Sequence, residues 1–344
     1  MALPQPASSI ELPAAPGGTP ASGRYRLGGR WSTLAGLWDI LRGNRKALVG
    51  FAILVGFALI ALLGPLLAPY DANKIGVGLP SQSPSAHHWL GTTRLGQDIL
   101  SQLLAGTRAS LLLAVSVGLL ATFLAMAVGL TAGYIGGLVD DVLSLLTNVF
   151  LIIPSLPLLI VFSAYATAFN LRGWWIMAAG ITITSWPWGA RAMRSQMLAM
   201  RNKDFVLAAR VTGESWIRIV RAEILPNMLS IVAANFIFSC LAAVVAEAGL
   251  EFIGLGDTSR ATWGTILYWA QGDAALLQNE WWWFMPPGLA IGLFSTGLVL
   301  LNYAIDEMTN PRLRSERLYR ENRQARAAAG AEPRTPVLDD VSTA

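Results

Sequence analysis

The stretch ALVGFAILVGFALIALLGPLLAP, from Ala47 to Pro69, holds 23 consecutive residues without a charged or strongly polar side chain. A helix needs about 20 mostly apolar residues to cross the hydrocarbon core of a bilayer. The apolar part of a secretory signal peptide is shorter and lies close to the amino terminus, whereas 46 residues precede this stretch. The sequence therefore predicts a transmembrane helix here rather than a cleaved leader.

The composition of the whole chain indicates the same environment. Of its 344 residues, 54% are hydrophobic and 13% are charged, and the mean hydropathy is +0.50. Soluble domains carry about 25% charged residues, so this chain has too few charges to solvate two globular surfaces. A backbone in lipid must satisfy its own hydrogen bonds, and we therefore predict an all-α polytopic membrane protein.

Six apolar blocks predict six transmembrane helices. The third block is expected to kink at Pro154 and Pro157, and the fourth is short and closes with Trp186-Pro187-Trp188. The expected spans are Ala47–Pro69, Ser110–Tyr134, Val142–Phe169, Trp174–Trp188, Asn227–Glu247 and Phe284–Ile305.

The remaining segments have distinct compositions. Residues 1–30 are rich in Pro, Ala, Gly and Ser and predict a disordered tail, and residues 31–46 form a basic segment beside the membrane. Residues 70–107 are expected as an extracytoplasmic loop. Residues 108–310 hold the other five spans with an inner loop at 189–226, and residues 311–344 form a carboxy-terminal tail.

The distribution of positive charge predicts the orientation. With the amino terminus inside the cell, the cytoplasmic segments hold 20 of the 25 lysines and arginines. The outer segments hold the other five, which are Lys74, Arg94, Arg108, Arg172 and Arg260. The positive-inside rule therefore places both termini in the cytoplasm, which requires an even number of spans.

The sequence lacks the residues of an enzyme or a metal site. Cys240 is the single cysteine, and His87 and His88 are the two histidines, which we expect to be exposed loop residues and not ligands. No phosphate-binding G-x-x-x-x-G-K-[ST] motif occurs, nor does a G-x-S-x-G or H-E-x-x-H motif. We predict no catalytic and no metal-binding residue, and a partner that supplies the energy for any transport.

The inner loop contains DFVLAARVTGESWIRIVRAEILPN, from Asp204 to Asn227. Apolar residues recur there at three- and four-residue steps, which is typical of amphipathic helices. Gly213 interrupts the pattern and Leu225-Pro226 ends it, so two short helices with a bend between them are expected. The periodicity alone fits two functions equally well: a helix pair that docks on another protein, and a basic helix that lies on anionic lipid.

The order of residues in this loop resembles a known family. The loop is similar to the one by which ABC importer permeases dock onto their ATPase subunits. The similarity lies in Ala208-Ala209, followed after three residues by Gly213, and in Leu225-Pro226, which begins twelve positions after Gly213. Leu207 stands where that family usually has Glu. The residues that the resemblance assigns to docking are Ala208, Ala209, Arg210, Gly213, Glu214, Arg218, Arg221, Glu223, Leu225 and Pro226.

Other segments resemble the dipeptide/oligopeptide/nickel branch of that family, and its C-type permease subunit in particular. They are HWLGTTRLGQDILSQLLAGTRASL (His88–Leu111), EAGLEFIGLGD (Glu247–Asp257), WGTILYWAQ (Trp263–Gln271), WWWFMPPGLAI (Trp281–Ile291) and NPRLR (Asn310–Arg314). The resemblance covers roughly residues 35 to 318. It implies a type I ABC importer permease with six transmembrane helices and a cytoplasmic coupling helix.

The resemblance also implies partners. They are a homologous second permease subunit, two ABC ATPase subunits, an extracytoplasmic solute-binding protein and membrane lipid, with no nucleic acid. ATP and magnesium would bind to the ATPase subunits, and this chain would bind no cofactor. The implied location is the bacterial cytoplasmic membrane.

Two groups near the expected outer surface are pathway candidates. Glu247 and Glu251 lie near the outer end of the fifth span, where a carboxylate either reaches water or faces a pathway or a binding protein. Trp281, Trp282 and Trp283 fit interfacial anchors, and the alternative is a surface on which substrate stacks.

Several alternatives stay open. Short peptides are the favoured substrate because the bilayer core lacks the acidic residues that free cations would need, and oligosaccharides or nickel complexes remain as alternatives. A secondary transporter or channel would act without an ATPase. A scaffold would bind a partner through the inner loop without transport.

Overall fold

The computed structural model describes residues 45–169 and 173–309 of the chain. The predicted amino-terminal tail, most of the juxtamembrane segment and the tail at 311–344 lie outside these ranges. The described elements are all helical, and the one β feature among them is an isolated bridge between Thr92 and Asp98.

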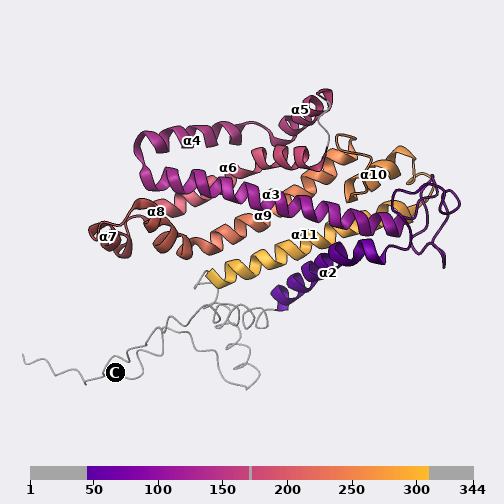
Figure 1. Ribbon diagram of the computed structural model, residues 1–344, viewed down its shortest axis with the longest axis horizontal. Coiled ribbons are helices and arrows are strands. Elements are labelled where there is room, and N and C mark those ends of the chain that lie inside the picture. The colour runs from indigo at the N-terminus through magenta and orange to yellow at the C-terminus, as the bar shows by residue number, and fades with distance from the viewer. Residues whose placement is uncertain (1–44, 170–172, 310–344) are drawn as a thin grey trace, which may run out of the picture. The chain divides into compact units, whose positions relative to one another are not determined.

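The helices follow one another along the chain as shown in Figure 1. They are α2 (Arg45–Leu67), α3 (Ile99–Ile135), α4 (Gly137–Ile152), α5 (Ser155–Ala168), α6 (Trp174–Met200), α7 (Asp204–Val211), α8 (Trp216–Arg218), the π-helical η1 (Ile219–Ile224), the 3-10 helix η2 (Leu225–Met228), α9 (Leu229–Phe252), α10 (Trp263–Gly272) and α11 (Trp281–Thr309).

Four helical stretches have the length and apolar composition of membrane spans: Arg45–Leu67, Ile99–Ile135, Trp216–Phe252 and Trp281–Tyr303. The pair α4 and α5 makes a fifth if it counts as one span, with a bend of 86° between the two helices. Pro154 lies in that break, so the predicted kink is confirmed. The described residues thus hold four or five candidate spans, whereas the sequence predicts six.

The predicted fourth span corresponds to α6, whose end was predicted wrongly. The sequence places the end at Trp188, but α6 continues through Pro187 to Met200. Trp186 is buried and packs edge-on against Phe150, so tertiary packing holds the helix together across the proline. Protein covers much of α6, which lies against α3, α4, α5 and α9, and a helix so covered needs less apolar surface than one that faces lipid.

Glycines allow α3 and α6 to approach closely. A side-chain carbon at Gly129 would lie 2.5 Å from the carbonyl oxygen of Ala190, and one at Gly133 would lie 2.8 Å from Cβ of Met197. Small residues at such contacts are typical of helices that pack within membranes, where lipid tails are as apolar as leucine.

The helix after Gly213 also differs from its prediction, which ends it at Leu225-Pro226. α8, η1, η2 and α9 instead follow one another without interruption, as one helical stretch over Trp216–Phe252. Pro226 has no N–H to donate, and the π-helical and 3-10 turns around it change the backbone hydrogen-bonding pattern. Nδ2 of Asn227 donates a further hydrogen bond of 2.6 Å to the carbonyl oxygen of Glu223.

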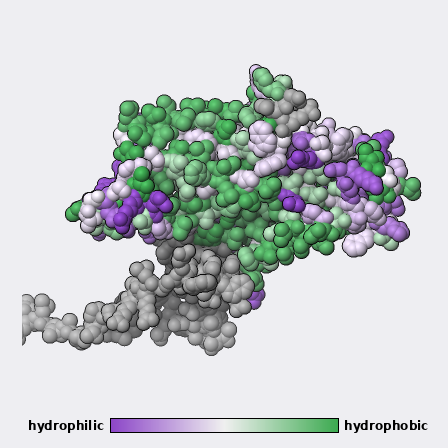
Figure 2. Space-filling model, viewed as in Figure 1, coloured by the Kyte–Doolittle hydropathy of each residue, from purple (hydrophilic) through white to green (hydrophobic). Residues whose placement is uncertain are grey.

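The helices separate two polar ends. α7 and α8 lie at one end of the bundle, which we call the α7 end, and α10 lies with the α2–α3 loop at the opposite α10 end (Figure 1). Figure 2 shows apolar residues over the helices between them and hydrophilic residues gathered at the two ends. Such a band of apolar surface is what a bilayer requires.

The packing of α2 against α11 gives a test of the fold. A side-chain carbon at Gly50 would lie 2.7 Å from Cβ of Leu300, whereas one at Gly56 would meet nothing within 4 Å. Gly50→Val is therefore expected to cost about 1–3 kcal/mol through overpacking and to lower the midpoint of thermal unfolding of the purified protein. Gly56→Val on the same helix is the control. Equal midpoints for the two variants would contradict this packing.

Candidate functional site

At the α7 end, the chain bends sharply between α7 and α8. Gly213 has φ of +79°, a conformation that costs glycine little and other residues more. Its N–H donates to the carbonyl oxygen of Arg210 at 3.0 Å, and the N–H of Glu214 donates to that of Ala209 at 3.2 Å. These bonds satisfy the last carbonyls of α7, and the predicted bend at Gly213 is confirmed. We call Asp204–Arg218 the elbow.

The elbow and the η1 turn that follows it are held to the rest of the bundle by buried side chains. Val206 of the elbow and Ile219 and Ile224 of η1 are each no more than 1% exposed and belong to one cluster with Met193 and Met197 of α6. A rigid connection results, because displacing the elbow would require this packing to open.

Aromatic and charged contacts fix the elbow further. The Arg210 guanidinium lies 5.1 Å from the ring centre of Tyr134, and that ring lies 6.2 Å from the ring of Trp216. The Nε of Arg218 lies 2.7 Å from a carboxylate oxygen of Glu214. These contacts orient the elbow on α3 without covering its outer surface.

The outer surface of the elbow is apolar with basic residues around it. Val211 is 88% exposed, and Leu207 and Ile217 are exposed as well. Six of the ten predicted docking residues are exposed, namely Ala208, Arg210, Gly213, Arg218, Arg221 and Pro226, and the other four (Ala209, Glu214, Glu223 and Leu225) are partly buried. An exposed apolar surface of this kind is typical of interaction sites.

At the opposite end, a cavity of about 610 Å³ opens between α3, α5, α6, α9 and the segment that joins α9 to α10. We call it the acidic cavity. The residues around it on which the chemistry depends are Arg108, Met177, Glu247, Glu251, Arg260 and Thr262.

The two glutamates of this cavity are buried. Glu247 is 2% and Glu251 is 4% exposed, so the expectation that they lie close to water is not met. The hydroxyl of Ser110 bonds Glu247, and the hydroxyl of Thr262 donates to Oε2 of Glu251. Both partners are neutral.

Two glycines leave the space that the Glu251 side chain occupies. A side-chain carbon at Gly264 would lie 2.5 Å from Oε2 of Glu251, and one at Gly256 would lie 2.6 Å from its Cγ. Thr262, which donates to this carboxylate, is the N-cap of α10 and forms a capping box with Thr265. The start of α10 therefore fixes the position of a carboxylate that belongs to α9.

The tryptophans do not join this cavity. Trp281 is 55% exposed, whereas Trp283 is 2% exposed and packs in a cluster with Ile99 and Ile266. None of Trp281, Trp282 and Trp283 lines the acidic cavity. The structure thus separates the two groups of residues that the sequence nominated together as pathway candidates.

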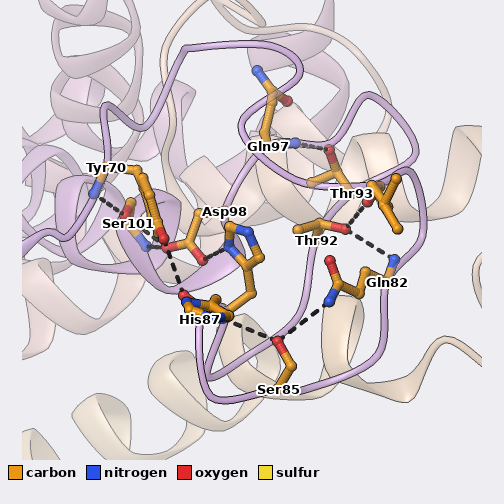
Figure 3. Close-up of polar contacts among 11 residues, drawn as sticks. Tyr70, Gln82, Ser85, His87, Thr92, Thr93, Gln97, Asp98 and Ser101 are labelled. Atoms are coloured by element: carbon orange, nitrogen blue, oxygen red, sulfur yellow. Dashed lines mark hydrogen bonds and ion pairs between the residues drawn. The ribbon is translucent and has the colours of Figure 1, made fainter.

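A hydrogen-bonded loop precedes α3 at the same end (Figure 3). Nδ1 of His88 lies 2.9 Å from Oδ1 of Asp98, and Oδ2 of Asp98 accepts from the N–H and the hydroxyl of Ser101 at 2.8 and 2.7 Å. Asp98 is thus the N-cap of α3. His88 is only 4% exposed, so the prediction that it is an exposed loop residue is wrong, because Asp98 provides a buried partner that sequence spacing does not reveal.

The rest of the loop is tied to α3 and to itself. The N–H of Tyr70 donates to Oγ of Ser101 at 3.2 Å. The ring centres of Tyr70 and His88 lie 5.0 Å apart. Oγ1 of Thr92 accepts from the N–H of Gln82 at 2.9 Å (Figure 3). His87 is exposed as predicted. In residues 45–169 and 173–309, no three His, Cys, Asp or Glu side chains form a group that could hold a metal ion.

Reasoning from the sequence missed the neighbours of the glutamates. Arg108 and Gly264 lie in segments that resemble the permease family, whereas Thr262 lies outside them, and no local pattern brings any of the three to Glu251. Glu251 and Thr262 are 11 residues apart, and Ser110 and Trp263, joined by a 3.3 Å bond, are 153 apart. Tertiary packing alone creates this site.

Comparison with known families agrees with the geometry. Residues 125–315 match the family model described as "Binding-protein-dependent transport system inner membrane component". Residues 32–85 match the model described as "N-terminal TM domain of oligopeptide transport permease C".

Individual relatives cover most of the chain. The dipeptide transport system permease protein of Bacillus subtilis is 30% identical over 80% of this chain and 85% of its own length. The oligopeptide transport system permease protein of Mycobacterium tuberculosis is 32% identical over 72% and 84%. A solved structure of a methionine ABC transporter in an inward-facing conformation aligns with a TM-score of 0.47 and 19% identity, over 62% of this chain and 95% of that one.

The loop before α3 yields a second test. Asp98→Ala removes the cap of α3 and the partner of buried His88, which together stabilise the fold by about 2–5 kcal/mol. We expect residues 70–98 of this variant to be cut much faster in limited proteolysis. Asp71→Ala is the matched control, because Asp71 is exposed and accepts one local bond from the N–H of Asn73. Equal cleavage rates would show that the His88–Asp98 pair does not hold the loop.

Proposed function

This chain belongs to the family of binding-protein-dependent transport system inner membrane components, and we propose that it is a permease subunit of an ATP-binding-cassette importer that carries short peptides across the cytoplasmic membrane. The observation that carries this proposal is the match of residues 125–315 to the family model. The relatives named as dipeptide and oligopeptide permeases, about 30% identical over most of both chains, support the peptide substrate.

The proposed assembly contains four further protein chains. A second, homologous permease subunit forms the pathway with this chain, and both lie in the lipid membrane. Two ATPase subunits bind ATP and magnesium. An extracytoplasmic binding protein delivers the peptide. The sequence supports the assignment of ATP binding to the partner subunits, because this chain contains no phosphate-binding G-x-x-x-x-G-K-[ST] motif. The chain itself then carries out no catalysis.

The proposed topology has six spans, with α6 as the span that protein shields from lipid. Both termini then lie in the cytoplasm, and so does the elbow. The excess of lysine and arginine in the segments that this arrangement puts inside, 20 against five outside, supports it. The α10 end and the acidic cavity accordingly face the side from which the substrate arrives.

The elbow is proposed as the coupling helix on which an ATPase subunit docks. Its exposed Val211, Leu207 and Ile217 offer an apolar centre, and Arg210, Arg218 and Arg221 offer charge around it. An interface with an apolar centre and a polar rim is the usual arrangement. Since Val206, Ile219 and Ile224 are packed against α6, a movement of the docked ATPase is transmitted to the spans.

This role can be tested at Gly213. A side-chain carbon there meets nothing within 4 Å in this chain, so Gly213→Trp adds bulk to the docking surface without an internal clash. We expect the ATPase subunits to be lost from the complex when the permease is purified by an affinity tag, and peptide uptake to fall at least 100-fold.

Gly76→Trp is the matched control. Gly76 has φ of +71°, close to the +79° of Gly213, and a side-chain carbon there also meets nothing within 4 Å, but it lies at the α10 end. The backbone strain is therefore alike in both variants. The control is expected to keep its ATPase subunits. Full retention of the ATPases by Gly213→Trp, or equal loss from both variants, would refute the docking role of the elbow.

A further inference from the structure

The acidic cavity has the size of a ligand site. Its volume of about 610 Å³ lies within the range of about 300–1,000 Å³ that is usual for small-molecule sites. Four helices and the α9–α10 segment enclose it, and Met177 and Leu113 give it apolar walls. A short peptide, with its apolar carbons and charged ends, requires both kinds of surface.

The two carboxylates in its wall have no positive partner among the described residues. Glu247 and Glu251 are 2% and 4% exposed, and within residues 45–169 and 173–309 no Lys, Arg or His forms an ion pair with either of them. A buried charge is costly unless a charge of opposite sign lies beside it. A cation bound between the two carboxylates would supply such a charge.

An ammonium group fits this need better than a metal ion. It has three N–H donors, and the two carboxylates, each of which already accepts from one hydroxyl, supply the acceptors. The backbone at Gly256 and Gly264 lies close against Glu251, and the hydroxyl of Thr262 orients its carboxylate, which reduces the entropic cost of binding. The described residues offer no third His, Cys, Asp or Glu for a metal site.

The same cavity carries positive charge. Arg108 lines it, is exposed, and makes no hydrogen bond or ion pair with another described residue. Arg260 also lines it and lies 3.8 Å from Asp257. Buried negative charge together with exposed positive charge is the arrangement that a zwitterion requires.

We propose that the acidic cavity binds the free amino terminus of the transported peptide, with the ammonium group held between Glu247 and Glu251. This inference rests on the proposed function, since it assigns the substrate's recognition to a site within the permease itself. The permease then binds peptides that lack the ammonium group more weakly, so it selects among peptides after the binding protein has released them.

The experiment measures binding to the permease and ATPase complex without its binding protein, so that selection by that protein does not enter. Ala109, in the cavity wall, is replaced by cysteine and labelled with a maleimide; native Cys240 is 2% exposed and stays unlabelled. Trialanine is expected to slow the labelling at a concentration at least tenfold lower than N-acetyl-trialanine.

Three variants locate the discrimination. Glu247→Gln and Glu251→Gln, each made alone, keep the shape of the cavity and are expected to abolish the tenfold difference between the two peptides. Glu280→Gln is the matched control, because Glu280 is also 4% exposed but does not line the cavity, and it is expected to keep the difference.

The possible results separate this inference from the proposed function. Equal protection by both peptides, or an undiminished difference in both cavity variants, overturns the inference, even where ATP-driven uptake of peptides by the complete transporter is intact. Absence of any ATP-driven peptide uptake by the complete wild-type transporter overturns the proposed function. Where one cavity variant fails to assemble, the other decides the inference.

Discussion

The close contact of α6 with α3 is the constraint on which the rest of the bundle depends. Gly129 and Gly133 let the two helices touch backbone to backbone, and in lipid such van der Waals packing has to replace the hydrophobic effect as the force between helices. Because α6 is held in this way, it connects both ends of the bundle. Met177 near its start lines the acidic cavity, and Met197 near its end packs against the elbow.

Arginines of α6, and Arg201 directly after it, bind the helix to α4 and α3 as well. Arg194 donates two bonds of 2.5 and 2.6 Å to the carboxylate of Asp140 on α4, Arg201 donates to the carbonyl oxygen of Gly133 at 3.0 Å, and Arg191 donates to Asn148 at 2.7 Å. These partners belong to α3 and α4. Planar guanidinium groups suit such paired contacts. These arginines lie beyond Trp188, where the sequence placed the end of the fourth span.

The features that the sequence predicted correctly are those set by local properties. The length of the apolar stretches located α2, α3 and α11, because lipid acts on each helix separately. The bend at Gly213 could also be predicted, because its positive φ depends on the residue type at that one position. The ends of helices were predicted less well. The expected second span starts at Ser110, but α3 begins at Ile99 because Asp98 caps it with two bonds to Ser101.

The parts of the site that escaped prediction depend on contacts between distant segments. The acidic cavity needs Thr262 and Gly264 from α10 against Glu251 of α9, and burial of His88 needs a loop that folds back on Asp98. Nothing in the spacing of these residues distinguishes a buried carboxylate from an exposed one. For this reason the two glutamates could be nominated from the sequence but their surroundings could not.

The continuous helix from Trp216 to Phe252 joins the proposed docking site to the proposed peptide site. Trp216 of the elbow and Glu251 of the cavity are separated by 35 residues of helix, or roughly 50 Å at 1.5 Å per residue. Only the stretch around Pro226 departs from regular α-helix, with its π-helical and 3-10 turns, and such turns are where a long helix bends most easily. A force applied at the elbow is therefore transmitted to the carboxylates along this helix. The π-helical and 3-10 turns, which lie close to the elbow, are the place where the helix bends most easily. Since Gly256 and Gly264 lie directly against Glu251 near the far end of this helix, tilting the helix would move the carboxylates relative to α10 and change the shape of the acidic cavity.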